Sequence, residues 1–193
     1  MIESVLTKRK FSLKVKVTIK ALISFGIIAL SVVLPQLVHL IAGAPGGVKW
    51  LPMYLPVLLG GCLLGYVWGL GIGILAPVVS FGVTSAFGNP MPALTRLPFM
   101  ICELAVFATI SGLFSKRIVS NGWMAFPAVL LASVCGRAAF MLLVVVFQGI
   151  TIPSLAPAVV WGQIQTGLLA VVIQAVIVPF IVMGINYLLK KHD

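Results

Sequence analysis

Long runs of apolar residues, broken by short groups of glycine, proline and charged residues, extend along nearly the whole sequence. A helix of about 20 mostly apolar residues is long enough to cross a bilayer. The borders of the runs predict an all-α, polytopic bundle of six transmembrane helices, at residues 17–42, 51–67, 69–87, 96–115, 123–148 and 158–189.

The breaks between these runs predict how the helices connect. Only 66–71 joins the second and third helices, so we expect a tight hairpin whose glycines at 60, 61, 65, 69, 71 and 73 let the backbones approach closely. Three prolines in 87–98 must interrupt helical structure, and 80–87 is expected to be irregular already. The sixth helix is longer than a bilayer needs, so it is tilted, kinked at Pro179 or extended beyond the membrane.

Composition limits the chain to one membrane domain. Of 193 residues, 61% are hydrophobic and 8% charged, which leaves no room for a soluble domain beside six spans. We therefore expect a single domain over 1–193 with a basic cytoplasmic segment at about 1–16. The net charge of +10 sits at the ends of apolar runs rather than on a soluble face, which argues against nucleic-acid binding.

The basic residues also predict the orientation. Lysines and arginines gather at 8–20, at 116–117 and at 190–191, and cytoplasmic flanks of membrane helices are enriched in both. With six spans all three groups lie on one side, whereas five spans would put the last group outside. We therefore expect both termini in the cytoplasm and a multi-pass protein of the cytoplasmic membrane.

Arg137 is the strongest functional indication, because it lies near the middle of the fifth span. A charge there costs several kcal/mol unless it is paired or faces a wet cavity. Glu103 lies about seven residues, or roughly 10 Å, inside the outer end of the fourth span, so the two depths allow contact. The pair either fixes helix packing alone or lines a ligand cavity that opens outward.

Other polar residues have two readings each. Arg96 either reaches interfacial water or contacts a ligand, and Asn89 either forms a turn or positions a ligand. Gln163 and Gln174 are nearly three turns apart on one helix face, which predicts a polar cavity lining or hydrogen bonds between helices. Gln165 points elsewhere.

Aromatic residues and histidines add less. Tyr54 and Trp161 lie near external helix ends, as residues of an aromatic belt do, although both are placed to stack on a flat ligand. His39 and His192 are isolated, so we expect no metal site.

Enzyme signatures are missing from the sequence. Its acids are Glu3, Glu103 and Asp193, and only Glu103 falls inside a span, which argues against paired-carboxylate catalysis. No Walker pattern is present, so ATP hydrolysis would need a partner subunit. We expect neither a catalytic site nor a cofactor.

Three segments carry a resemblance to a known family. They are PMYLPVLLGGCLLGYVWG at 52–69, GIGILAPVVSFGVTSAFGNPMPAL at 71–94 and LPFMICELAVFATISGLFSKR at 97–117. With their order of apolar hairpin, proline-rich loop and glutamate-bearing helix, the chain resembles the substrate-binding S components of energy-coupling factor (ECF) transporters, which are ABC-type vitamin importers. The patterns are similar to S components for pyridoxine, hydroxymethylpyrimidine and pantothenate.

The resemblance implies a mechanism. An S component captures one vitamin from outside, in a cavity capped by the loops after its first and third helices. It then joins an EcfT-like transmembrane coupling protein and two ATPase subunits, and is thought to topple in the membrane to release its cargo inward. The resemblance implies cavity contacts from Glu103, Arg137, Gln163, Arg96, Tyr54, Asn89 and Trp161. Gln174 is added to these candidates because it shares a helix face with Gln163.

The family's first helix presents an AxxxA-type surface of small residues to the coupling protein. Here Phe25 stands four residues after Ala21, so that pattern is not intact. Ser24, Gly26 and Ala29 offer an approximate substitute beside Ala21.

The implied ligand is small, polar and partly planar. Vitamin B6 or hydroxymethylpyrimidine fits best, whereas pantothenate would make Arg96 and Arg137 its main anchors. Two other classes of function stay open: a small transporter or channel that needs no ATPase, and a structural membrane subunit in which Glu103 and Arg137 only pack together.

Overall fold

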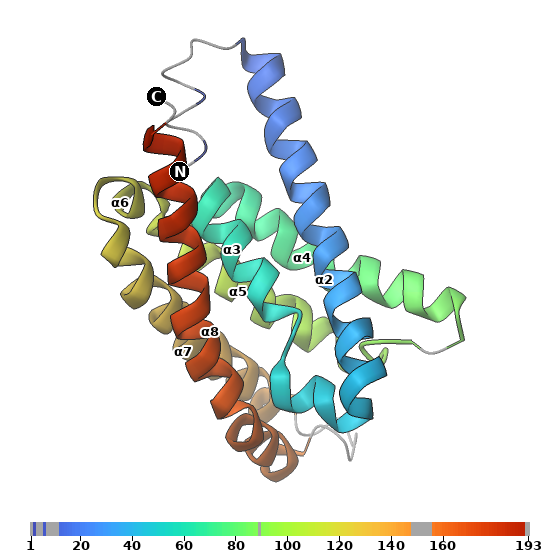
Figure 1. Cartoon of the computed structure of the whole chain (residues 1–193). Helices are drawn as coiled ribbons and strands as arrows, with labels where there is room; N and C mark the ends of the chain where they lie inside the picture. Colours follow the sequence, from blue (N-terminus) through green and yellow to red (C-terminus); the bar gives the residue numbers. More distant parts are fainter. Residues whose placement is uncertain (1, 3–5, 7–11, 89, 148–155, 192–193) are drawn as a thin grey trace.

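The computed structural model describes residues 2, 6, 12–88, 90–147 and 156–191, and every regular element in these ranges is helical. The all-α prediction is therefore confirmed. Figure 1 shows how the helices are arranged; they are α2 (Leu13–Trp50), α3 (Tyr54–Leu64), α4 (Tyr66–Ala86), α5 (Leu97–Leu113), α6 (Ser115–Ser120), the 3-10 helix η1 (Gly122–Met124), α7 (Ala125–Val146) and α8 (Pro157–Lys191).

The six longest helices fall on the six predicted segments, with differences at their ends. Helix α2 continues past residue 42, but its backbone breaks at Gly43, where φ is 66° and ψ is −172°. The expectation that 80–87 is irregular is wrong, since α4 is helical through Ala86. The Thr84 hydroxyl donates to the Ser80 carbonyl one turn back at 2.7 Å, a bond compatible with an unbroken helix.

Four helical stretches among the described residues are long and apolar enough to cross a membrane: Leu13–Gly43, Tyr66–Ala86, Gly122–Val146 and Pro157–Leu189. The other two main helices are shorter than predicted. Helix α3 has 11 residues, about 16 Å by helical rise, and α5 has 17, about 26 Å. Helix α3 ends at Gly65, whose φ is 87°. Nearly all residues of α3 are buried in protein. Helix α3 therefore has little contact with the surroundings.

Glycines let α3, α4 and α5 pack at backbone distance. A Cβ atom at Gly69 would lie 3.0 Å from the Cα atom of Gly61, as expected for the hairpin. The closest approaches, however, are to α5. A Cβ atom at Gly61 would lie 2.5 Å from the Ala108 carbonyl oxygen, and one at Gly73 would lie 2.6 Å from the Leu104 carbonyl oxygen. Because Cβ atoms do not come this close to other atoms, these positions require glycine.

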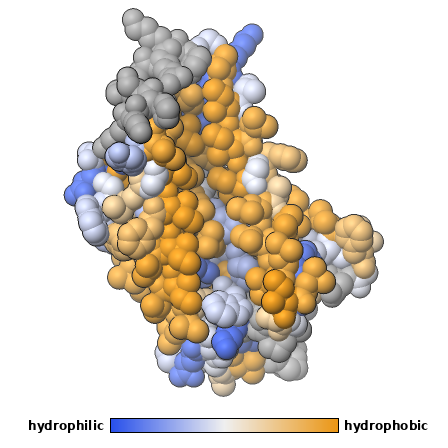
Figure 2. Space-filling view, viewed as in Figure 1, coloured by the Kyte–Doolittle hydropathy of each residue, from blue (hydrophilic) through white to orange (hydrophobic). Residues whose placement is uncertain are grey.

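The outer surface is apolar to a degree that only lipid tolerates. Figure 2 shows apolar side chains over most of one face. On α2, Leu22 and Phe25 are each 71% exposed. Exposed apolar surface this extensive is expected where lipid replaces water as solvent. The chain is a multi-pass membrane protein.

The small residues predicted to meet the coupling protein do not all share a face of α2. Ala21, Gly26 and Ala29 are exposed. Ser24 is only 8% exposed and belongs to the inner side of the helix. Ser24 lies two positions before the exposed Gly26 and therefore on nearly the opposite side of the helix, so its inclusion in the docking surface is corrected.

The two ends of the bundle differ. The start of α2, the end of α8 and helix α6 lie at one end, the upper end in Figure 1. The links from α2 to α3 and from α4 to α5 lie toward the other end. The basic residues Lys14, Lys116 and Lys191 thus share the upper end, and the candidate site described next lies toward the lower one.

Candidate ligand-binding site

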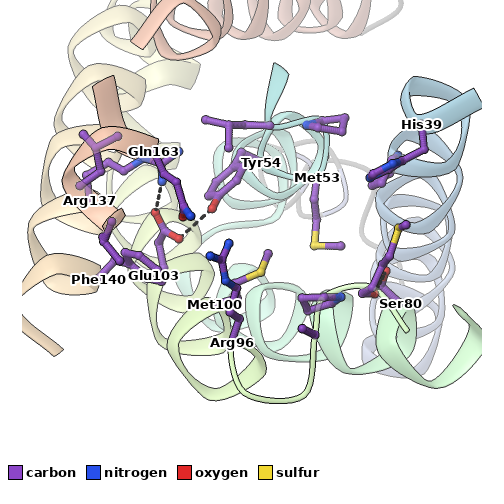
Figure 3. Close-up of a pocket in the computed structure, with 18 residues that line it drawn as sticks. His39, Met53, Tyr54, Ser80, Arg96, Met100, Glu103, Arg137, Phe140 and Gln163 are labelled. Carbon is purple, nitrogen blue, oxygen red and sulfur yellow. Dashed lines mark hydrogen bonds and ion pairs between the residues drawn. The ribbon is translucent and has the colours of Figure 1, made fainter. Parts of the chain in front are cut away.

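A cavity of about 430 Å³ lies among α2, α3, α4, α5, α7 and α8, next to the two lower links. Its volume is in the range of sites that hold small molecules. Figure 3 shows two groups of polar side chains at its walls, with Tyr54, Glu103, Arg137 and Gln163 on one side and His39 and Ser80 on the other. The rest of the lining is mainly apolar and includes Met53, Met91, Met100, Pro35, Pro52, Pro92 and Phe140.

The charged centre of the cavity is a pair from α5 and α7. Arg137 Nη1 lies 3.0 Å from Glu103 Oε1, with side-chain exposures of 14% and 1%. The Tyr54 hydroxyl donates to Glu103 Oε2 at 2.7 Å, and Arg137 Cζ lies 4.9 Å from the centre of the Tyr54 ring. The expectation that these two charged side chains can interact is confirmed.

This charged centre keeps bonding positions that nothing in the described part of the chain fills. Arg137 Nη2 is buried without a hydrogen-bond partner. Glu103 Oε1 makes the ion pair with Nη1 and has no further hydrogen-bond partner. A buried polar group that has no partner costs about 1–3 kcal/mol. Both residues line the cavity, but these two atoms have almost no accessible surface, so the pair meets the cavity mainly through the exposed 14% of the Arg137 side chain.

Local packing explains why the two charges meet. Gly136 precedes Arg137 on α7, and a Cβ atom at Gly136 would lie 2.7 Å from the Phe107 ring on α5. The missing side chain lets α7 approach α5 at this level. Phe107 in turn packs edge-on against Tyr54, with ring centres 5.0 Å apart. One aromatic contact therefore sets the spacing between the helices that carry Glu103, Arg137 and Tyr54.

The proline-rich link forms another wall and is tied to α4. The Met91 backbone N–H donates to Thr84 Oγ1 at 2.7 Å, and the Ser80 hydroxyl donates to the Met91 carbonyl at 2.9 Å. Ser80 and Thr84 are one turn apart, so one face of α4 holds both polar groups of the Met91 backbone. This places Met91 and Pro92 beside the cavity.

Residues 20–182 match the family model described as "ECF transporter, substrate-specific component". The chain belongs to this family. Comparisons with curated proteins and with solved structures gave no match. Family membership confirms the resemblance stated from the sequence and makes this ECF substrate-specific component a substrate-binding membrane protein.

The structure brings five of the predicted contacts of this S component to the cavity. They are Tyr54, Arg96, Glu103, Arg137 and Gln163. Tyr54 is 5% exposed, so its assignment to an aromatic belt is wrong. Asn89 lies outside the described residues.

Two predicted contacts of the S component lie away from the lining. Trp161 is 53% exposed and faces outward, as the belt interpretation expects. Gln174 is 5% exposed, and its amide donates to the backbone carbonyls of Trp50 and Leu51 at 3.2 and 3.0 Å. Its place in the cavity lining is therefore corrected. Gln174 instead holds the link that carries Leu51, Pro52 and Met53 along the cavity wall.

Several lining residues of the S component were not predicted. His39 was considered only as a metal ligand, and within the described ranges no three His, Cys, Asp or Glu side chains gather as a metal site would require. Ser80 could have been predicted, because it lies one helical turn before Thr84 and next to a proline-rich loop. The methionines at 53, 91 and 100 had none, because apolar residues are common along every helix of a membrane protein.

Proposed function

We propose that this S component captures a small water-soluble vitamin at the outer face of the cytoplasmic membrane and delivers it through an ECF importer. The observation that carries the proposal is the cavity of about 430 Å³, whose wall holds the Glu103–Arg137 ion pair together with Tyr54 and Gln163. The coupling protein and two ATPase subunits would supply the energy, and this chain would hydrolyse no ATP.

The proposal includes six membrane-crossing helices in one domain over 1–193, with both termini in the cytoplasm. The shared position of Lys14, Lys116 and Lys191 at one end supports it, because basic residues favour the cytoplasmic side. The cavity would then open toward the outside. Ala21, Gly26 and Ala29 on the exposed side of α2 are the proposed contact with the coupling protein.

Vitamin B6 or a hydroxymethylpyrimidine is the proposed cargo. Methionine and proline side chains offer soft apolar surfaces to a flat ring, and the polar group around Glu103 offers both donors and acceptors. Pantothenate is the alternative cargo and would depend on Arg96 and Arg137.

The experiment is to purify the chain in mild detergent, denature it and identify any released small molecule by mass spectrometry. We expect a stoichiometric vitamin, and direct titration of the emptied protein should give submicromolar affinity. A well-folded protein without a bound vitamin or affinity for one would refute the proposal.

Uptake assays separate this function from transport by the chain alone. Proteoliposomes with this chain, the coupling protein and ATPases should accumulate the vitamin only when ATP is present. Accumulation by liposomes that contain this chain alone would instead show a self-sufficient transporter.

A further inference from the structure

Helix α6 and the turn η1 form a cap over residues 115–124 at the upper end of the bundle, away from the cavity (Figure 1). On one side of α6, Ser115 and Ile118 are buried against the protein. Lys116 and Arg117, between them in the sequence, are exposed. The short helix therefore turns two positive charges outward.

Helix α8 holds this cap in place. The Asn186 side-chain amide donates to the Ile118 carbonyl at 3.2 Å, and Asn186 is buried. A Cβ atom at Gly122 would lie 3.2 Å from Met183 Cγ, so η1 packs against the same stretch of α8. A buried hydrogen bond together with close packing fixes the cap relative to α8.

Aromatic side chains form a row beside the two charges. Trp123 is 66% exposed, and its ring stacks on Phe126 with centres 5.6 Å apart. Phe126 meets the exposed Phe180 of α8 edge-on, also with centres 5.6 Å apart. The Asn121 N–H donates to the Arg117 carbonyl at 2.9 Å, and the Asn121 side chain accepts from the Trp123 N–H at 3.2 Å. One residue thus ties the basic helix to the aromatic row.

The aromatic row continues into the exposed apolar surface of α7 and α8. Leu130 and Val134 follow Phe126 at intervals of four residues, so they share its face of α7, and both are exposed. Ile177, one turn before Phe180 on α8, is exposed as well. Aromatic residues at the edge of a lipid-facing surface lie at the level of the lipid headgroups. The basic pair beyond them therefore lies at the level of the lipid phosphates.

The described part of the chain offers these two charges no carboxylate. Glu103 is the only acidic side chain in the described ranges, and it is buried beside the cavity. The Arg117 guanidinium instead lies over the Phe114 ring, with Cζ 5.7 Å from the ring centre. Arginine and lysine both bind phosphate oxygens through charge-assisted hydrogen bonds. The charge and the position of the pair thus suit a phosphate group carried by a lipid.

We infer that the α6–η1 cap binds the headgroup of an anionic phospholipid, with Lys116 and Arg117 on the phosphate and the aromatic row along the acyl chains. This interaction surface lies at the opposite end of the bundle from the cavity and does not depend on which cargo the cavity holds. A net negative lipid is favoured over a zwitterionic one, because basic residues next to the membrane attract net negative charge and the choline group would bring a further cation.

Native mass spectrometry of the full chain in mild detergent tests the inference. The probes are phosphatidylglycerol and phosphatidylcholine with the same acyl chains, added at equal concentration. We expect one phosphatidylglycerol to be retained in clear excess over phosphatidylcholine. The double variant Lys116→Gln with Arg117→Gln should reduce this preference about tenfold or more, since each basic residue contributes separately to the binding of anionic lipid.

A second double variant, Lys14→Gln with Lys16→Gln, is the matched control. It removes the same charge at the start of α2, which lies at the same end of the bundle but on the other side of it from α6 (Figure 1). The preference for phosphatidylglycerol should stay unchanged in this control.

Trp123→Leu separates the aromatic row from the charges. This variant loses the ring that stacks on Phe126 and keeps both basic residues. Retention of the two lipids should fall by a similar factor, while the preference for phosphatidylglycerol remains. A loss of the preference in Trp123→Leu would contradict the assignment of headgroup selection to the basic pair.

Three further results would overturn the inference. The first is equal retention of the two lipids by the unaltered chain, which needs no variant to fold. The second is a preference that survives the removal of Lys116 and Arg117; if that variant then failed to assemble with the coupling protein, the cap would be a protein interface instead. The third is an equal loss of preference in both double variants, which would show a diffuse attraction to the basic end rather than a site.

Discussion

Replacing Arg137 by methionine removes one partner of a buried pair and keeps most of the side-chain volume. Glu103 would then hold a carboxylate that is 1% exposed, with the Tyr54 hydroxyl as the remaining donor at 2.7 Å. Breaking a buried ion pair in this way costs about 3–5 kcal/mol. This is a large share of the 5–15 kcal/mol typical of folded proteins, so we expect a folded but clearly weakened variant.

The assay is reversible unfolding by SDS in mixed micelles, followed by circular dichroism. A double variant, Arg137→Met with Glu103→Gln, removes both charges and should recover most of the lost stability, because no uncompensated charge remains. Protonation of Glu103 has the same effect, so the loss in the single variant should shrink as the pH is lowered. Ligand affinity should be lost in both variants, since each lacks the guanidinium donor.

Two results would contradict this reasoning. If Arg137→Met unfolds with the same free energy as the unaltered chain, Glu103 does not depend on the guanidinium. If the double variant is stable and still binds the ligand with unchanged affinity, the pair serves only to pack α5 against α7.

Three other substitutions test separate parts of the structure. Gly61→Ala should lower the unfolding free energy by about 1–3 kcal/mol, because the added methyl group would meet the backbone of α5. Gly71→Ala is the control and should be neutral or slightly stabilising, because no atom lies within 4 Å of the added group; equal effects of the two variants in SDS titration would disprove the close packing. Thr84→Val removes the acceptor for the Met91 N–H and should speed ligand dissociation by up to about tenfold in stopped-flow measurements, while Thr84→Ser should not. Gln174→Leu removes the hydrogen bonds to two backbone carbonyls and should lower the unfolding free energy by about 1–3 kcal/mol. Gln165→Leu, at an exposed position, is the control and should change it by less than about 0.5 kcal/mol. If Gln174→Leu has no effect in thermal unfolding, these hydrogen bonds do not hold the α2–α3 link.

The helices could be predicted from the sequence because lipid imposes a simple rule. Apolar runs bounded by glycine and proline located all six long helices to within a few residues at most ends. The sequence could not show that α3 is a short helix enclosed by protein, because apolar residues such as Val57 and Leu58 suit contact with lipid and contact with protein equally well. Only the three-dimensional packing shows that both are fully buried. The end of the first span near residue 42 agrees with the backbone break at Gly43, whereas the helical segment that continues from there to Trp50 was not predicted.

The centre of the site was predictable, and its periphery was not. The cost of a charge at mid-membrane singled out Arg137, and helical rise placed Glu103 at a matching depth. Helical spacing also put Gln163 and Gln174 on one helix face, but it does not show which groups each side chain contacts. Gln163 meets the cavity, while Gln174 meets backbone carbonyls first. Met91 reaches the wall through hydrogen bonds to α4 that no local pattern in the sequence shows.

Helix α5 is in backbone contact with two neighbours at once, through Ala108 against Gly61 and through Leu104 against Gly73. A helix seated this way has no room to slide or rotate, since any displacement drives carbonyl oxygens into α3 or α4. Glu103 lies on this tightly packed helix, so the packing of α5 holds its carboxylate in a fixed position. The link at Met91 is held to α4 through the Ser80 and Thr84 hydroxyl groups, so we expect it to move more easily than α5 when a ligand enters or leaves the cavity.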